Sequence, residues 1–322
     1  DERFIAYFLQ SLDFGGSSDK SSVPGLNRND LHRYEVLLPP LSEQRAIADV
    51  LGALDDKIEQ NRQPARVLMQ LTEAIFRTWF IDFGPVKAKA AGATSFPSMP
   101  QDLFNALPTT FTDESDIGAI PSGWATASLR DVATLVSGGT PSKKRPEFWG
   151  GEFPWVSAKD MHERIVLDSV LRLTDGGRGA VRQTAPRHAT LMVVRGMSLM
   201  SEVRIGWCAR EVAFNQDLRA FVARDRVSPE FLFLWLTSSE RELLQMVDTA
   251  SHGTGRIRTD RLETLMIAIP SRAMIARFTE LARPIMALRE SLVRESHRLA
   301  IVRDYLLRQL LSGRARVEAA DA

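Results

Sequence analysis

Apolar residues recur at steps of three and four over two long stretches of the chain, a spacing that predicts amphipathic helices. The first helix is expected over residues 41–83, with Ser42 as its N-cap. A polar Asn61 lies in its apolar seam, and Pro64 is expected to break the helix. The predicted seam comprises Ile47, Leu51, Leu54, Ile58, Asn61, Leu68, Ile75 and Trp79.

The second helix is expected over residues 271–313 and has the cleaner pattern. Its heptad seam is interrupted once, at Glu295, and Pro284 predicts a kink or a junction between two helices. From Met274 to Leu310 it would extend roughly 55 Å at about 1.5 Å per residue. The predicted seam comprises Met274, Phe278, Leu281, Ile285, Leu288, Leu292, Leu299, Val302 and Leu306.

A single apolar stripe on each helix requires a partner surface. We predict that the two helices pack together as an antiparallel coiled coil, because each is the simplest partner for the other. The alternative is that both helices cover the core of the domain between them.

The pattern changes twice between the helices. Residues 84–118 are proline-rich and predict a loop-rich connector, whereas residues 119–270 carry short apolar runs separated by Gly and Pro, which are typical of strands. Residues 231–248 are expected to be helical. The predicted strands are Val132–Val136, Trp155–Ser157, Ile165–Leu167, Ala189–Val194, Ile205–Cys208 and Leu218–Val222. The expected fold class is α+β, a globular domain with a twisted β-sheet flanked by two long helices.

An internal repeat relates the two ends of the chain. Pro39 and Pro270 are 231 positions apart, similar residues precede both prolines, and a predicted helix follows each. Residues 1–40 therefore resemble the last part of the domain at 119–270. We expect them to be the C-terminal remnant of a first such domain, either in a fragment or in a half-subunit that dimerises. Residues 314–322 are expected to be a disordered tail.

Composition narrows the class of protein. A hydrophobic content of 44% and a charged content of 25% are ordinary for a globular protein. No apolar run reaches the length of a membrane span, and the first residues lack the pattern of a secretory signal. The single cysteine, Cys208, excludes an internal disulfide and suits a reducing compartment, so a cytoplasmic location is expected. A net charge of +1 decides nothing about nucleic acid, since a basic face can be offset elsewhere.

Sequence motifs for catalysis are absent. The chain contains neither a phosphate-binding loop nor a dinucleotide-binding glycine pattern, and its five histidines and one cysteine lack metal-ligand spacing. Leu38–Leu41 resembles the Asn-Pro-Pro loop of amino-methyltransferases only superficially, because the Asn or Asp is missing. We therefore expect no catalytic residue, no metal site and no cofactor in this chain.

Polar and cationic loops gather instead in residues 119–270. Ser137–Arg145 combines glycines, which expose backbone N–H groups, with three successive cations that could contact phosphate. Residues 172–226 hold ten arginines and no lysine, and arginine can bond bidentately to guanine and to phosphate. Phe214–Asp217 offers amides that could pair with adenine, and Ser251–Arg258 adds hydroxyls and arginines. These loops predict contact with DNA.

Each of these signals has an ordinary alternative. They could be a solvated turn, the arginine usage of a GC-rich genome, or amides that satisfy buried backbone groups. Their concentration in one domain is the stronger indication. The candidate DNA contacts are Thr140, Ser142, Lys143, Lys144, Arg145, Trp155, Ser157, Lys159, Arg204, Asn215, Gln216, His252, Thr254 and Arg256.

Short motifs in a specific order run along essentially the whole chain. They are Leu38–Arg45 with Leu54–Ile58, Trp79–Lys89, Ile120–Trp124, Gly138–Ser142 with Trp149, Pro154–Val156, Asn215 with Gln216, and Leu306–Gly313. Together they resemble the specificity subunits of type I restriction–modification systems. The proline-proline helix start and the Gly-Gly-Thr-Pro loop, in this order, are the most specific of them.

The resemblance implies a mechanism and a set of partners. Members of that family carry two target-recognition domains, each of which reads one half of a bipartite double-stranded DNA site, and two helices space them. Modification subunits bind S-adenosylmethionine and methylate adenine, and restriction subunits use ATP and magnesium. The resemblance also implies docking of these partners on the helices and connector. The docking candidates are Glu43, Gln44, Trp79, Phe80, Asp82 and Phe83.

Two other interpretations stay open. The chain could be the C-terminal specificity region of a fused restriction–methylation enzyme, with its catalytic domains upstream of Asp1. It could also be a coiled-coil scaffold without a role at DNA, in which case no salt-dependent DNA binding is expected.

Overall fold

The computed structural model describes residues 1–12, 38–113, 115–250 and 254–317. It contains two compact units, and each is described by itself: unit 1 comprises Asp1–Ala65 with Ser291–Ala322, and unit 2 comprises Arg66–Glu290. The first copy of the predicted repeat falls mostly in residues 13–37 and lies outside the described residues, as do residues 318–322 of the predicted tail. No helix among the described residues is both long and apolar enough to cross a membrane.

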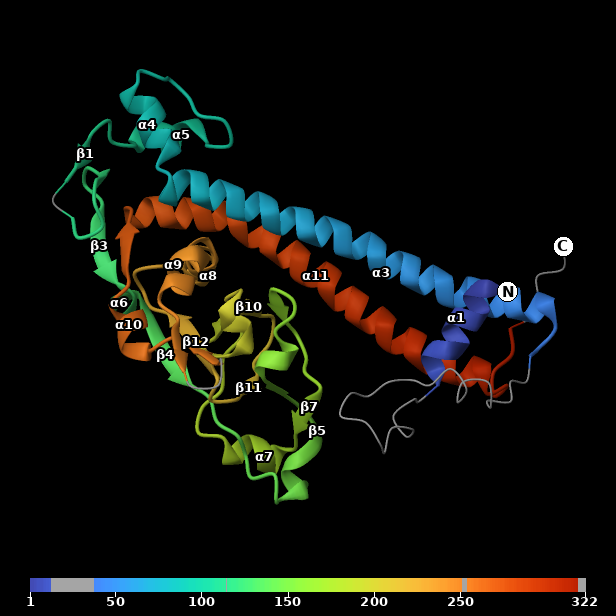
Figure 1. Cartoon of the computed structure of the whole chain (residues 1–322). Coiled ribbons are helices and arrows are strands. Elements are labelled where there is room, and N and C mark those ends of the chain that lie inside the picture. The colour runs from blue at the N-terminus through green and yellow to red at the C-terminus, as the bar shows by residue number, and fades with distance from the viewer. Residues whose placement is uncertain (13–37, 114, 251–253, 318–322) are drawn as a thin grey trace. The chain divides into compact units, whose positions relative to one another are not determined.

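Two long helices, α3 (Leu41–Phe76) and α11 (Arg272–Leu311), contribute to both units (Figure 1). In unit 1 they pack with the short helix α1 (Glu2–Ser11). The buried residues of this core are Phe4, Tyr7, Ile47, Ala48, Leu51, Leu307 and Leu310.

The seam of unit 1 contains one polar pair. Asn61 of α3 is buried, and its Nδ2 donates a hydrogen bond to a carboxylate oxygen of Glu295 on α11 at 3.0 Å. Arg303 of α11 bonds to Asp55 of α3 at 2.6 Å. Rising residue numbers on α3 therefore meet falling numbers on α11, so the helices are antiparallel. The two polar residues that interrupt the predicted seams face each other.

In unit 2 the same two helices meet around a cluster of aromatic rings. Phe76 of α3 lies 5.5 Å from Phe278 of α11 and 5.0 Å from Phe231, measured between ring centroids. Phe80 lies 5.0 Å from Phe278 and belongs to a single π-helical turn, η1 (Arg77–Ile81), that follows α3. Phe231 belongs to α8 (Pro229–Ser238), an apolar helix buried over nearly its whole length. The predicted packing of the long helices is confirmed, and here they also cover the core of a domain.

That domain is built on a mixed five-stranded sheet with the order β4-β12-β8-β10-β6. All neighbouring strands are antiparallel except β10 and β6. Arg219 of β12 lies between Ser137 of β4 and Met192 of β8. The strands are β4 (Ala133–Ser137), β12 (Leu218–Ala223), β8 (Thr190–Val193), β10 (Ile205–Cys208) and β6 (Ile165–Val166).

Smaller sheets and short helices complete unit 2. The sheets pair β1 with β2, β15 with β3, β5 with β7 and β11, and β14 with β13 and β9. Their strands are β1 (Phe111–Thr112), β2 (Ile120–Pro121), β3 (Ala125–Ser128), β5 (Trp149–Val156), β7 (Leu171–Leu173), β9 (Arg195–Gly196), β11 (Ala213–Phe214), β13 (Asp248–Ala250), β14 (Thr254–Arg256) and β15 (Met266–Ile269). The helices are α4 (Gly84–Ala90), α5 (Gln101–Ala106), α6 (Leu129–Val132), α7 (Asp175–Ala180), α9 (Glu240–Gln245) and α10 (Thr259–Glu263), with 3-10 turns η2 (Pro146–Phe148), η3 (Ala158–Asp160) and η4 (Met197–Met200).

The α+β class and every predicted strand are confirmed, and several local predictions need correction. The connector at residues 84–118 carries α4 and α5 as well as loops. Helix α3 already includes Leu41, so Ser42 is not an N-cap. Pro64 and Pro284 lie inside single helices rather than at a break or a junction. Each proline removes one backbone donor, and the packing of long helices against a core can offset that loss.

The predicted seam of the second helix is wrong at Leu281, Leu288 and Val302, whereas Leu306 packs on the core of unit 1. Leu281 and Leu288 are 40% and 52% exposed, whereas Ala282, Met286 and the charged pair Arg289 and Glu290 are buried. Trp207 of β10 donates a hydrogen bond from Nε1 to Glu290 at 2.6 Å, and Arg187 bonds to the same carboxylate at 3.0 Å. Because Trp207 and Arg187 satisfy its carboxylate, Glu290 can be buried on α11. The apolar pattern instead predicts burial of the nearby Leu288.

Phe76 makes the aromatic cluster testable. We expect Phe76→Ala to lower the free energy of unfolding by roughly 3–5 kcal/mol, because a fully buried ring leaves a cavity between α3, α8 and α11. Leu71→Ala, on the same helix but 48% exposed, is the control and should change stability by less than about 0.5 kcal/mol. Urea denaturation measures both. Equal effects of the two substitutions would contradict the central place of the cluster.

Tyr7 gives unit 1 a spectroscopic signature. Its hydroxyl donates to Asp55 at 2.6 Å, and burial, followed by this hydrogen bond, raises the pKa of Tyr7 from 10.0 to about 12. Because the folded-state pKa lies above the ordinary value, the stabilisation is complete below about pH 10 and is lost as the pH rises through about 12. In an absorbance titration of the folded protein, Tyr7→Phe should remove the component that ionises last. Loss of a component near pH 10 would contradict the assignment, and Tyr305→Phe, at an exposed tyrosine, is the control.

Candidate nucleic-acid interface

The glycine loop that follows β4 rests directly on the end of β11 and on the residues that follow it. Gly139 donates its backbone N–H to the carbonyl of Phe214 at 2.8 Å. A Cβ atom on Gly138 would lie 2.3 Å from that same carbonyl oxygen, so only glycine fits this close approach. Thr140 donates from Oγ1 to Oε1 of Gln216 at 2.9 Å, with both residues exposed. Two predicted contacts that are 76 positions apart therefore lie side by side.

Two tryptophans donate hydrogen bonds to backbone carbonyls of the loop after β4. Trp155 donates from Nε1 to the carbonyl of Gly139 at 2.9 Å, and Trp149 donates to the carbonyl of Ser142 at 3.3 Å. Their rings meet edge to face at a centroid distance of 5.3 Å. Trp155 is only 5% exposed, so it supports the loop, and the prediction that it contacts DNA directly is corrected.

Asn215 and Ser157 also have internal hydrogen-bond partners. Asn215 is buried, its amide donates to the Asp217 carboxylate at 3.0 Å, and its side-chain oxygen accepts the backbone N–H of Asp217 at 3.2 Å. Ser157 forms a capping box with Asp160. For Asn215 the ordinary alternative therefore holds, because its amide satisfies local polar groups and is not free to read a base.

Three arginines converge beside Gln216. Arg219 of β12 bonds from Nη1 to the carbonyl of Gln216 at 3.2 Å, and Arg195 and Arg256 pair across β9 and β14. Burial, followed by the proximity of Arg195 and Arg256, lowers the pKa of Arg219. Among the described residues, neither Arg195 nor Arg256 has a carboxylate within salt-bridge distance. The arginine cluster (Arg195, Arg219 and Arg256) therefore concentrates positive charge next to the exposed Thr140 and Gln216.

Several other arginines of the 172–226 stretch are held by ion pairs within the domain. Arg172 pairs with Asp168, Arg178 with Glu211 at 2.8 Å, Arg187 with Glu290 at 3.0 Å, and Arg204 with Glu202 at 2.6 Å. Ion pairing of this kind holds the candidate Arg204 against its own loop. Arg195 and Arg219 were not among the site predictions, because their proximity depends on strand pairing that the sequence does not reveal.

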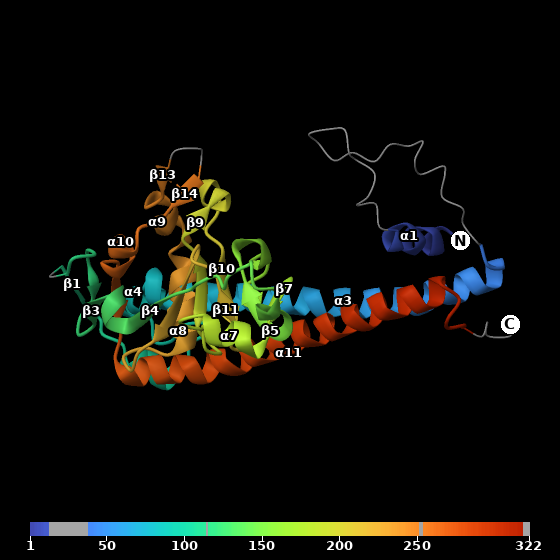
Figure 2. The ribbon, with the colours of Figure 1, turned by 90° about the horizontal axis from the view of Figure 1, so that it is seen from below.

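The remaining candidates differ in their exposure and contacts. Ser142, Lys143, Lys144 and Lys159 are exposed, and Arg145 stacks over the ring of Phe148 at 5.3 Å. Thr254 begins β14, and His252 lies outside the described residues. Within unit 2, Figure 2 shows β9, β13 and β14 on the side opposite the first half of α11. The strands that carry Arg195, Thr254 and Arg256 are therefore on the face of the domain away from that helix.

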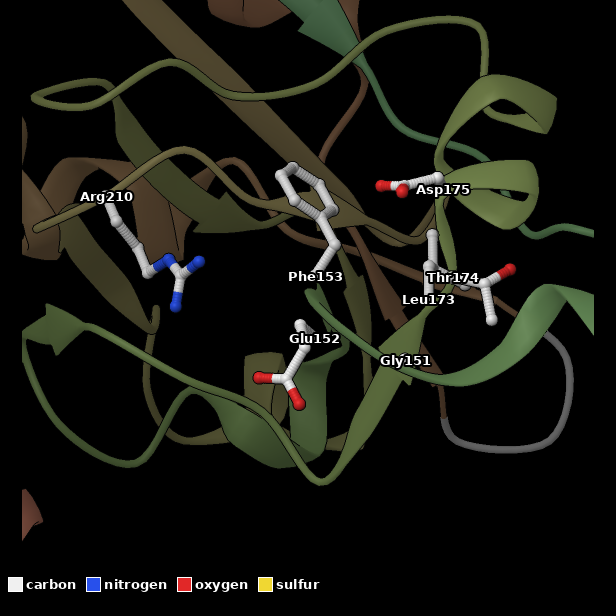
Figure 3. A pocket seen from close by; sticks show the side chains of 7 residues that line it. All are labelled: Gly151, Glu152, Phe153, Leu173, Thr174, Asp175 and Arg210. Carbon is white, nitrogen blue, oxygen red and sulfur yellow. The ribbon is translucent and has the colours of Figure 1, made fainter.

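A separate shallow pocket of about 340 Å³ lies at the start of β5 (Figure 3). Phe153 points into its middle, with Arg210 on one side and Glu152 and Asp175 on others. The two carboxylates, Glu152 and Asp175, outnumber the one arginine and repel an anion. The pocket therefore does not extend the basic surface.

The docking candidates divide into buried and accessible residues. Trp79 and Phe80 are buried in the aromatic cluster, which corrects the prediction that they contact a partner directly. Gln44 is buried and donates to the carbonyl of Pro39 at 2.9 Å. Phe83 packs edge to face on Trp124 at 5.5 Å. Asp82 is exposed and Glu43 is half-buried.

An α+β domain that presents a hydroxyl, an amide and a cluster of arginines on one face belongs to a class of protein suited to contact with DNA. The sequence model of the type I restriction modification DNA specificity domain matches residues 1–68 and 121–274, which is more than half of the chain. The chain therefore belongs to this family.

Known relatives agree with this assignment. The specificity subunit of the type I restriction enzyme HindI from Haemophilus influenzae is 26% identical over 337 residues, covering 92% of this chain and 72% of that protein. The MjaIX specificity subunit from Methanocaldococcus jannaschii is 22% identical over 306 residues, covering 94% and 65%. This chain thus spans about two thirds to three quarters of the length of these relatives.

One solved structure supports the same fold. The type I restriction-modification system S subunit from M. genitalium matches with a TM-score of 0.54 at 13% identity, over 96% of this chain and 72% of that one. The HsdS subunit from Thermoanaerobacter tengcongensis matches at 17% identity with a TM-score of 0.39, over 98% and 71%.

The two loop glycines provide a matched test of the interface geometry. We expect Gly138→Ala to destabilise the protein by roughly 1–3 kcal/mol, because its methyl group must displace the backbone of Phe214. Gly139→Ala meets no atom within 4 Å and should be nearly neutral. Urea denaturation compares the two. A neutral Gly138→Ala would show that the loop does not rest on the end of β11 and the residues that follow it.

Proposed function

We propose that the β-rich domain of this chain reads one half of a bipartite double-stranded DNA site, as the non-catalytic specificity component of a type I restriction–modification complex. The observation that carries the proposal is the convergence of Thr140, Gln216 and the arginine cluster on one surface. Arg195 and Arg256, which form no ion pair among the described residues, suit phosphate, and the exposed amide of Gln216 suits a base edge.

The division of labour follows from the chemistry of the groups on this surface. Arg195 and Arg256 would contact phosphates and so set the position of the domain on the DNA backbone. Phosphate contacts carry no sequence information, so these arginines would not read bases. Thr140 and Gln216 would read bases. Their mutual hydrogen bond fixes the amide in one orientation, so its N–H group is presented outward as a donor.

The long helices supply the second part of the proposal. α3 has 36 residues and α11 has 40, so each is longer than one turn of B-DNA, about 34–36 Å. We place docking of the modification subunits, which would bring S-adenosylmethionine, and of the restriction subunits, which would bring ATP and magnesium, on these helices and the connector. Glu43 and Asp82 are the accessible members of the predicted docking set.

Salt dependence of DNA binding tests the proposal. The full chain, alone and with its cognate modification subunit, is titrated against a fluorescent random-sequence duplex at several salt concentrations. Affinity should fall linearly with salt on a log–log plot, and Arg195→Ala, Arg219→Ala and Arg256→Ala should each reduce the slope by about 1. The control is Arg277→Ala on α11, which breaks the ion pairs of Arg277 to Asp102 of α5 and to Glu280. It should leave the slope unchanged. Salt-insensitive or absent binding by the unmodified chain contradicts the proposal.

A further inference from the structure

Two large apolar side chains project from the turn beside the arginine cluster. The 3-10 turn η4 (Met197–Met200) follows β9, and Met197 and Met200 are 78% and 53% exposed. Met197 is among the most exposed large apolar side chains of the described residues. Isolated exposed apolar residues are common, but two on one short turn next to a basic surface call for a function.

The turn that carries these methionines is anchored at its base. Leu199, between them, is 2% exposed, and a Cβ atom on Gly255 of β14 would lie 2.7 Å from the Cβ of Leu199. Ser198 accepts backbone N–H groups from Ser201 at 3.0 Å and from Glu202 at 2.8 Å. The methionine side chains are therefore presented outward from a fixed base.

Positive charge on one side of the turn indicates its partner, while on the other side Arg204 is paired with Glu202 at 2.6 Å. Arg195 lies two residues before Met197 and pairs with Arg256 across β9 and β14, and Arg219 lies close to both. In duplex DNA an apolar stack of bases runs beside rows of phosphates, so apolar tips next to a cluster of cations match its chemistry. The same cations would repel a basic protein surface and would be unpaired against an apolar one.

We propose that Met197 and Met200 form an apolar wedge that enters the base stack of the bound duplex and partly unstacks one base step. The inference rests on the proposed function, because the arginine cluster must first bind the phosphate backbone of the DNA. Side chains of this kind kink DNA when they insert between base pairs, and methionine is unbranched enough to follow the shape of the opened step. Pyrimidine–purine steps yield most easily, so the wedge selects sequence by deformability in addition to hydrogen bonding.

The test uses the full chain and a defined probe. A random-sequence duplex pool is enriched by rounds of binding to the unmodified chain, and the enriched duplex is then used for every variant. Fluorescence anisotropy gives affinity and its salt slope, and permanganate oxidation reports unstacked thymines, which both TA and CA/TG steps contain. The variants are Met197→Ala with Met200→Ala, and Met197→Leu with Met200→Leu. Leu281→Ala with Leu288→Ala, at exposed apolar positions of α11, is the matched control.

We expect the alanine pair to bind the enriched duplex about tenfold or more weakly, to lose the permanganate-reactive thymine and to keep the salt slope, because methionine contacts no phosphate. The leucine pair should keep most of the affinity and reactivity, and the α11 control should match the unmodified chain.

Three results overturn the wedge. They are full affinity and reactivity in the alanine pair, equal loss in the leucine and alanine pairs, and a reduced salt slope in the alanine pair. If the arginine variants lose binding while the alanine pair does not, the wedge fails and DNA recognition stands. If the unmodified chain enriches no duplex and binds none, the proposed function fails and the wedge with it.

Discussion

The packing of aromatic rings between α3, α11 and α8 is the interaction on which the architecture of unit 2 depends. Phe76 and Phe80 meet Phe278 and Phe231 at 5.0–5.5 Å, so one cluster joins the end of one long helix, the start of the other and the buried helix of the domain. Rings at these distances and tilts add to the burial of their area. Since α8 contacts β8, β10 and β12, the position of the central sheet follows from this cluster.

A second contact between α11 and the five-stranded sheet is made by charged and polar groups and not by apolar packing. Trp207 and Arg187 both bond to the buried carboxylate of Glu290. Next to it, burial lowers the pKa of Arg289 to about 10, and burial raises the pKa of Glu73, which pairs with Arg164 at 3.6 Å. Buried charges add little net stability, but removing one partner is costly because the other is left unpaired. Such a network therefore fixes one packing arrangement between the helix and the sheet, and the apolar cluster supplies the stability.

Much of this fold could be predicted, because period and turn chemistry are local properties. The helical spacing located α3 and α11, and β-type runs located every strand of the central sheet. The exposure of Leu281 and Leu288 and the burial of Glu290 could not be predicted, since the partners of Glu290 are over eighty positions away in sequence. The same limit applies to the site. Glycines and cations marked the loop after β4, but Arg195 and Arg219 come together with Arg256 only through the pairing of distant strands. Trp155 and Asn215 were predicted as contacts from residue type, and their burial was not visible in the sequence.

The arginine cluster is where stability and function oppose each other. Three cations close together repel one another, and burial lowers the pKa of Arg219 further. Elsewhere in the domain arginines of the same stretch are neutralised, as Arg178 is by Glu211 and Arg187 by Glu290. Asp217 offsets part of this repulsion at Arg219, but among the described residues no carboxylate forms an ion pair with Arg195 or Arg256. Local destabilisation of this kind is expected where a ligand supplies the missing charge. A row of phosphates supplies it without displacing Met197 and Met200, which then face the bases between the rows.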